Sequence, residues 1–199
     1  MILFDTLRSG NAWKVRLLLR NMGQDFERKT LDLAKGDTKT PEYLAMSPRG
    51  QVPVMQFDDG TYLAQSPAIL ARIAEGTTYF PADPVTRNKI LEWMFFEQCD
   101  LLKPLAIPRF IVALAGQGEE KADVVKQFQD QGYPMLAIME KRLAKSDFLV
   151  NGYSIADINL YPYTSMAHLG NYDMDRFPAI QAWIKRVESQ PGWVPLIEE

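Results

Sequence analysis

The hydrophobic pattern of this 199-residue chain changes once, at a Gly-, Thr- and Pro-rich stretch over residues 76–84. Before it, short apolar runs that fit strands alternate with segments of helical spacing. After it, the apolar residues recur only at helical spacing. A chain of this length holds one large domain or two small ones. We therefore predict an α/β domain over residues 1–75, a linker over 76–84 and an all-helical domain over 85–199.

The α/β part begins with the pattern of a βαβ unit. The apolar run at 1–4 fits a buried strand, and residues 12–19 have helical spacing, with Gly23 placed to end the helix. Weak alternation over residues 26–31 fits a second strand. Because the three elements follow one another within about thirty residues, the two strands should be parallel.

A helix, a hairpin and another helix complete this part. Thr40 and Pro41 have the residue types of a helix cap and a first helical residue. Residues 52–57 and 61–63 flank an Asp-Asp-Gly turn and predict a β-hairpin. Ser66 is expected to cap the next helix, which should end near residue 75.

Four helical patterns follow the linker, over residues 85–115, 120–144, 154–169 and 177–188. Within the first we expect Met94, Phe95, Phe96 and Cys99 to be buried in the core. Met135 and Met139 should join them from the second. Ser154 and Asp157 have the spacing of a capping box, a structural role, and His168 should lie at the surface or at a helix end.

The charge balance excludes several classes of partner. With 22 basic and 25 acidic residues the net charge is -3, whereas nucleic-acid readers carry a basic excess. No apolar run approaches the roughly 18 residues of a membrane span. Asp5, Arg8 and Lys14 interrupt the N-terminal run, unlike a signal peptide. One cysteine and one histidine leave no disulfide and no metal site, so we expect a cytoplasmic protein.

Four motifs, in the right order along essentially the whole chain, resemble those of the cytosolic glutathione transferases, particularly bacterial members. They are Ser9-Gly10-Asn11 with Lys14-Val15-Arg16, Gly50-Gln51-Val52-Pro53-Val54, Gln65-Ser66-x-Ala68-Ile69, and Gly152-Tyr153-Ser154-Ile155-Ala156-Asp157. The resemblance implies a thioredoxin-like N-terminal domain followed by an all-α C-terminal domain. It also implies glutathione as a substrate, no cofactor, and a homodimer.

Gln65, Ser66 and the segment around Pro53 are the residues that we expect to bind the tripeptide. A helix N-terminus binds carboxylate through its free N–H groups, to which Ser66 adds a hydroxyl and Gln65 an oxygen for the neighbouring ammonium. The alternative is that Ser66 only caps the helix. The resemblance implies a cis Pro53, which would expose the backbone of Val52 to the cysteinyl residue, with Gln51 alongside. A trans proline at a strand start is the alternative.

Ser9 and Asn11 are the candidate catalytic residues, because either side chain can donate a hydrogen bond to the sulfur beside a helix N-terminus. Backbone N–H groups of the same loop, or a pure capping role, remain as alternatives. Residues 6–14 contain neither Cys nor Tyr, which excludes an enzyme thiol or a tyrosine hydroxyl from this loop. The resemblance also implies that the helical domain over 85–199 holds the pocket for the second substrate. A few of the Met and Phe side chains assigned to the core are alternative candidates to line it, and Arg109 is a candidate anchor there for an anionic compound.

These features predict an enzyme that attacks small electrophilic compounds with glutathione thiolate. The alternative is a protein that retains the fold and binds glutathione or a partner without turnover.

Overall fold

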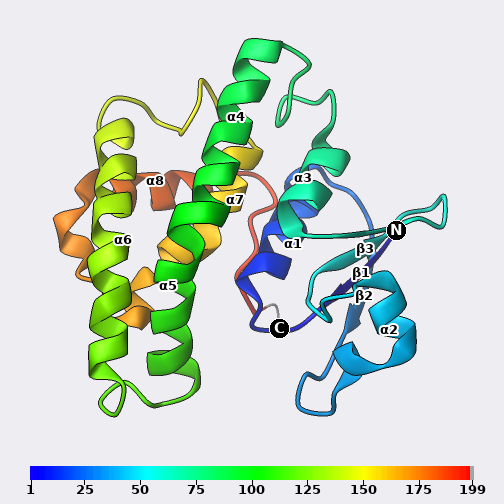
Figure 1. Ribbon diagram of the computed structural model, residues 1–199. Coiled ribbons are helices and arrows are strands. Elements are labelled where there is room, and N and C mark those ends of the chain that lie inside the picture. The colour runs from blue at the N-terminus through cyan, green and yellow to red at the C-terminus, as the bar shows by residue number, and fades with distance from the viewer. Residues whose placement is uncertain (198–199) are drawn as a thin grey trace.

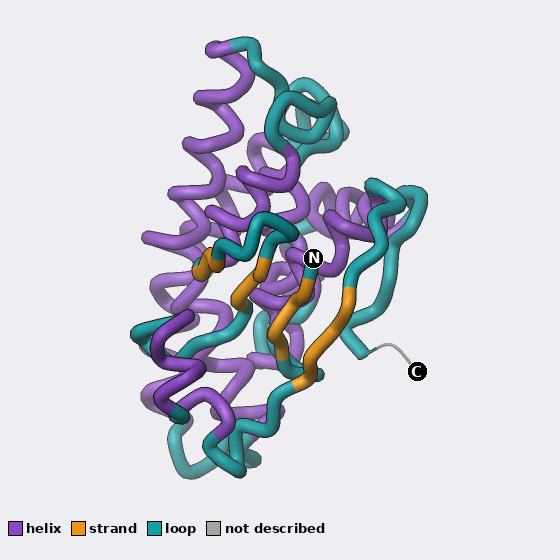
Figure 2. Tube along the Cα trace, turned by 90° about the vertical axis from the view of Figure 1, so that its right-hand side faces the viewer, coloured by secondary structure: helices purple, strands orange, loops and turns teal. Residues whose placement is uncertain are grey.

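Four short strands form a mixed sheet in the computed structural model, which describes residues 1–197 (Figures 1 and 2). The strands are β1 (Ile2–Asp5), β2 (Glu27–Thr30), β3 (Val54–Gln56) and β4 (Tyr62–Ala64), in the order β2-β1-β3-β4. β1 and β2 are parallel, and β1 and β4 each pair antiparallel with β3. The predicted βαβ unit and hairpin are confirmed.

Three helices cover the two faces of this sheet. They are α1 (Gly10–Asn21), α2 (Pro41–Met46) and α3 (Ser66–Ala74). α1 and α3 pack on one face through a cluster that includes Leu3, Val15 and Ile69. On the other face Tyr43 of α2 contacts Phe4. Because the opposite side of α1 contributes Leu17 to the largest core cluster, α1 lies between the sheet and the helical half (Figure 1).

Besides two short 3₁₀ helices, η4 (Ala167–Gly170) and η5 (Met174–Arg176), the helical half of the described chain contains five α-helices and two π-helical segments. They are α4 (Pro84–Phe96), η2 (Glu97–Leu101), α5 (Leu102–Arg109), η3 (Phe110–Leu114), α6 (Ala122–Leu143), α7 (Ile155–Ser165) and α8 (Pro178–Glu188). The pattern at 85–115 is thus helical over most of its length, but its backbone switches from α-helical to π-helical hydrogen bonding at two places, η2 and η3. Within residues 1–197, no helix combines the length and the apolar character that crossing a membrane requires.

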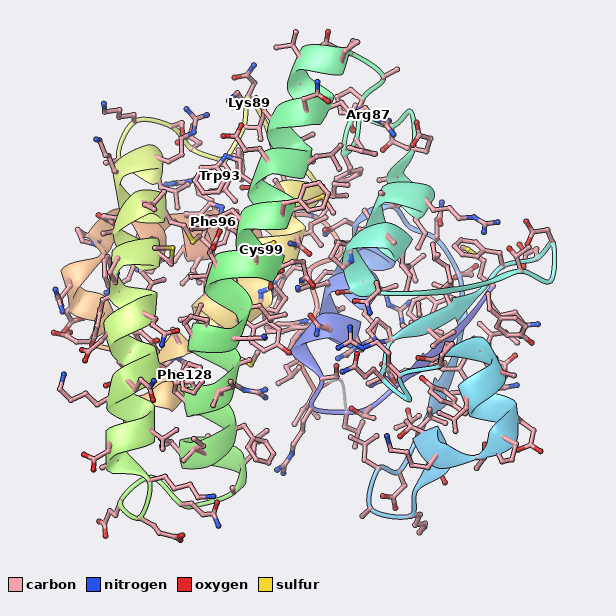
Figure 3. The ribbon with its side chains drawn as sticks, viewed as in Figure 1. Arg87, Lys89, Trp93, Phe96, Cys99 and Phe128 are labelled. Atoms are coloured by element: carbon pink, nitrogen blue, oxygen red, sulfur yellow. The ribbon has the colours of Figure 1, made fainter. Side chains whose placement is uncertain are left out.

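The first helical pattern buries fewer of its apolar residues than expected. Met94 is buried, and Trp93 and Phe96 project toward α6 with their rings 5.4 Å apart (Figure 3). Phe95, however, is 64% exposed. The prediction that Cys99 is buried is wrong: the thiol is exposed, since Glu97 and Leu101 occupy the inward face of this segment and Cys99 falls on the opposite side.

The capping box at the start of α7 is confirmed as a structural element. The Asp157 carboxylate accepts hydrogen bonds from the Ser154 amide at 3.1 Å, the Leu149 amide at 3.0 Å and the Trp183 indole at 2.9 Å. Asp157 is fully buried, so these donors replace the water that it loses. The single side chain therefore joins the start of α7 to α8 and to the loop before it.

Burial raises the pKa of Asp157 to about 6, against 3.8 for an ordinary aspartate, and outweighs the hydrogen bonds that oppose it. Its folded form therefore holds the proton more tightly than the unfolded chain, so this stabilising contribution is complete below about pH 4 and is lost as the pH rises to about 6. Relative to Asp157→Asn, we expect wild type to lose up to about 3 kcal/mol of unfolding free energy over this interval. Urea titrations of both proteins measure the difference, and parallel pH profiles would contradict the assignment.

Candidate functional site

A cavity of about 570 Å³ lies between the two halves of the molecule. Six of the predicted site residues line it, all from the N-terminal half: Asn11, Gln51, Val52, Pro53, Gln65 and Ser66. The opposite wall comes from the helical half and consists of Gln98, Leu102 and Lys103. The remaining lining residues are Leu33, Ser47, Arg49, Gly50 and Ala64.

The peptide bond between Val52 and Pro53 is cis, as the resemblance implied. The sheet pairs of β3 begin only at Val54, so the backbone of Val52 takes no part in the ladder. The preceding carbonyl, that of Gln51, accepts a hydrogen bond from the Tyr43 hydroxyl at 2.9 Å. The backbone of Val52 therefore lies outside the strand pairs, next to a Gln51 carbonyl that Tyr43 holds in place. An extended ligand can pair with the backbone at such a position.

Gln65 and Ser66 form the start of α3, one residue out of step with the sequence prediction. Gln65 is the N-cap and Ser66 the first helical residue, so Ser66 does not cap the helix. Gln65 has a φ of 74°, a left-handed conformation that is uncommon outside glycine and occurs often at ligand sites. Since Pro67 has no N–H, Ser66 and Ala68 supply the free amide donors of this first turn.

The side chains of Ser66 and Asn11 meet across the cavity floor. The Ser66 hydroxyl lies 3.4 Å from the Asn11 amide oxygen, a long and weak hydrogen bond. Its weakness leaves the hydroxyl able to turn to an anion. Because the oxygen of Asn11 accepts from Ser66, its NH₂ group remains a donor of this cavity-lining side chain.

Ser9 caps α1, as one of the sequence alternatives held. Its hydroxyl oxygen accepts a hydrogen bond from the Ala12 amide at 3.2 Å, and Ser9 is not among the residues that line the cavity. The cap uses only the oxygen, so the hydroxyl hydrogen stays available. Gly10 must lack a side chain here, because a Cβ would lie 2.9 Å from the ring of Tyr163 on α7.

A buried ion pair joins the two walls behind the cavity. Lys14 of α1 donates to Glu97 of η2 at 2.8 Å, and both side chains are 0% exposed. Glu97 also accepts hydrogen bonds from Asn159 of α7 and from Gln98, which lines the cavity. Desolvation lowers the pKa of Lys14, while the charge of Glu97 opposes the shift.

Arg109 is not among the residues that line this cavity, and its role as an anchor for an anionic second substrate stays a prediction. It is buried, and its guanidinium donates to the Arg8 carbonyl at 3.2 Å. Ser47, Arg49, Gln98 and Lys103 are the polar lining residues that sequence analysis missed. Arg49 had a signal, since it adjoins the Gly50 motif, whereas nothing local distinguished Lys103 from other helix lysines.

His168 lies outside the cavity. His168 is exposed, and its Nδ1 lies 2.9 Å from the Ser165 carbonyl oxygen. Residues 1–197 contain no cluster of three or more His, Cys, Asp or Glu side chains that could hold a metal ion.

Comparison with known proteins covers both halves. The family models of the glutathione S-transferase N-terminal and C-terminal domains match residues 8–75 and 98–191. A crystal structure of a glutathione S-transferase from Pseudomonas fluorescens is 40% identical, covers 99% of this chain and 98% of its own, and has a TM-score of 0.96. The disulfide-bond oxidoreductase YfcG of Escherichia coli is 29% identical, over 92% of this chain and 87% of its own. A maleylacetoacetate isomerase from Rhizobium meliloti is also 29% identical, over 93% of this chain and 90% of its own length.

Proposed function

Since the chain belongs to the glutathione S-transferase family, we propose that it binds glutathione in the cavity between its halves and transfers it to a small electrophilic compound. The observation that carries this proposal is the convergence of the cis Val52–Pro53 bond, the Ser66 helix start and Asn11 on one cavity. In this proposal glutathione is a substrate, and the enzyme needs no cofactor.

The register of the sheet supports one direction for the tripeptide. Val54 pairs with Ala64, so the start of α3 lies beside Pro53. With the γ-glutamyl carboxylate at Ser66 and the cysteinyl residue paired with Val52, the glycyl end extends toward Gln51 and Arg49. The thiol is then directed toward Asn11 and the loop that carries Ser9.

The reaction we propose is attack by the thiolate on an electrophilic carbon. A free thiol has a pKa near 8.5, so it is only a few per cent ionised at neutral pH. Hydrogen bonds from Asn11 or Ser9 and the N-terminus of α1 favour the ionised form. Relatives named as an isomerase and an oxidoreductase use other reactions, but the lack of Cys in residues 6–14 excludes an enzyme thiol there.

The supply of glutathione supports a cytoplasmic location, because the cytosol holds the reduced form.

Ser66→Ala should weaken glutathione binding far more than folding. Because Ser66 is not the cap of α3, we expect less than about 1 kcal/mol of lost stability, against about 1.5–3 kcal/mol of lost affinity for a charge-assisted bond. Calorimetric titration with glutathione measures the loss of affinity and thermal melting the loss of stability, with Ser189→Ala, an exposed residue at the C-terminus of α8 outside the cavity, as control. Equal losses would contradict the binding role. Wild type that does not bind glutathione would overturn the proposed function.

The pKa of the bound thiol should lie about two units below that of free glutathione, which corresponds to about 2.7 kcal/mol. Neither Ser nor Asn accepts a proton at neutral pH, so each acts only as a donor to the sulfur anion. We expect Asn11→Ala or Ser9→Ala to raise this pKa and to lower turnover, as measured by thiolate absorbance against pH. If neither variant changes the pKa, the backbone N–H groups carry the ionisation. Tight binding with an ordinary pKa and no turnover would indicate a non-catalytic protein.

An apolar groove between α3 and α4 supports a homodimer. It has a volume of about 300 Å³, and its apolar lining consists of Pro67, Ala68, Ala71, Leu91, Met94 and Phe95, with Gln65 and Gln98 as the polar lining residues. Phe95 at its edge is 64% exposed, which is costly unless another surface covers it. A two-fold axis would place the same groove of a second copy against it.

We expect sedimentation at micromolar concentration to give about 45 kDa, twice the chain mass of 22.7 kDa. Phe95→Glu should shift the protein to the monomer, because it buries a charge in the contact. Phe110→Glu changes another exposed phenylalanine outside the groove and should leave the dimer intact. A wild-type monomer would contradict this assignment.

A further inference from the structure

The cavity is cationic, although the chain as a whole is acidic. Arg49 and Lys103 line it, and no Asp or Glu is among its lining residues, while the net charge of the chain is -3. Such a cavity favours ligands with more than one negative charge.

Both cations are also free of internal partners. Within the described residues, neither Arg49 nor Lys103 forms an ion pair or a side-chain hydrogen bond, and both are exposed. Some other surface cations are held in ion pairs, among them Arg72 with Asp59, Arg87 with Glu75 and Lys126 with Asp130. The two cations at the cavity are therefore available to an anion without the loss of an existing contact.

Glutathione accounts for Arg49 but not for Lys103. In the direction given above, the glycyl carboxylate lies beside Gln51 and Arg49, and the γ-glutamyl carboxylate lies at the start of α3. Lys103 lies on the opposite wall with Gln98 and Leu102. That wall belongs to the helical half, and an electrophile has to lie between it and the sulfur.

We propose that Lys103 selects an electrophile that carries a carboxylate, which it binds while glutathione occupies the N-terminal wall. The inference rests on the proposed function, because it places the anion beside bound glutathione. Leu102 contacts the carbon skeleton of the same compound, and Gln98 offers an amide to its polar substituents.

A matched pair of aryl chlorides tests the proposal: a chlorodinitrobenzoate with the chlorine para to the carboxylate, and its neutral carboxamide. In both, the thiolate sulfur forms a bond to the ring carbon, the carbon–chlorine bond breaks, and chloride leaves with the electron pair. The thiol proton passes to solvent. Each kcat/KM is divided by the rate constant of the uncatalysed reaction, because the two substituents activate the ring differently.

We expect wild type to prefer the acid by about tenfold, and Lys103→Met to remove the preference by raising KM for the acid alone. Lys103→Arg should retain it. Lys145→Met removes an exposed lysine outside the cavity and controls for net charge. A wild type without preference overturns the proposal. So does a Lys103→Met variant that raises KM for glutathione equally with both chlorides, since Lys103 then holds the tripeptide.

Binding of the two reaction products separates this inference from the proposed function. Calorimetry with the carboxylate and carboxamide conjugates of glutathione needs no turnover. Suppose that the protein conjugates neither chloride but binds the acid conjugate more tightly, and that Lys103→Met abolishes this difference in affinity. That result would support the anion site and overturn the proposed transferase activity. Equal affinities would overturn the anion site, whatever the turnover, and binding of neither conjugate would overturn both proposals.

Discussion

The ion pair between Lys14 and Glu97 is the interaction on which the shape of the cavity depends. Both charges are fully buried, and transfer of such groups out of water costs several kcal/mol each. This desolvation cost is offset because Lys14 Nζ lies 2.8 Å from Glu97 Oε1 and because Asn159 and Gln98 donate further hydrogen bonds to Glu97. A shift of one half against the other would lengthen these contacts and leave two uncompensated charges, so the pair fixes the relative position of the two walls.

The same contact joins the starts of α1 and η2, the segments that contribute Asn11 and Gln98 to the cavity. Lys14 lies one turn after Asn11, which faces the cavity, and Glu97 directly precedes Gln98 on the opposite wall. The π-helical turn at Glu97–Leu101 widens the helix at this point, a deviation that is frequent at functional sites. The buried pair therefore links the part of α1 that lines the cavity to the segment of η2 that lines the opposite wall.

The sequence predicted what depends on neighbours along the chain and missed what depends on the other half. The capping box of Ser154 and Asp157 and the cap of α2 at Thr40 act within three residues, and both are confirmed. Whether Lys103 or Arg109 faces a ligand depends on how α5 lies against the β1–α1 loop. That placement follows from a pair 83 residues apart, which no local pattern reveals. Cys99 was misplaced for a related reason, since a charged residue, Glu97, takes the inward position.

The buried and the exposed cations near the cavity differ in whether they need a partner. A buried cation needs a partner to offset its desolvation, and Lys14 has one in Glu97. An exposed cation keeps its hydration, so Arg49 and Lys103 can stay unpaired at little cost in stability. An incoming anion then competes only with water, not with an internal carboxylate. The buried pair of Lys14 and Glu97 thus joins the two halves, whereas Arg49 and Lys103 lie at the cavity without an ion-pair partner among the described residues.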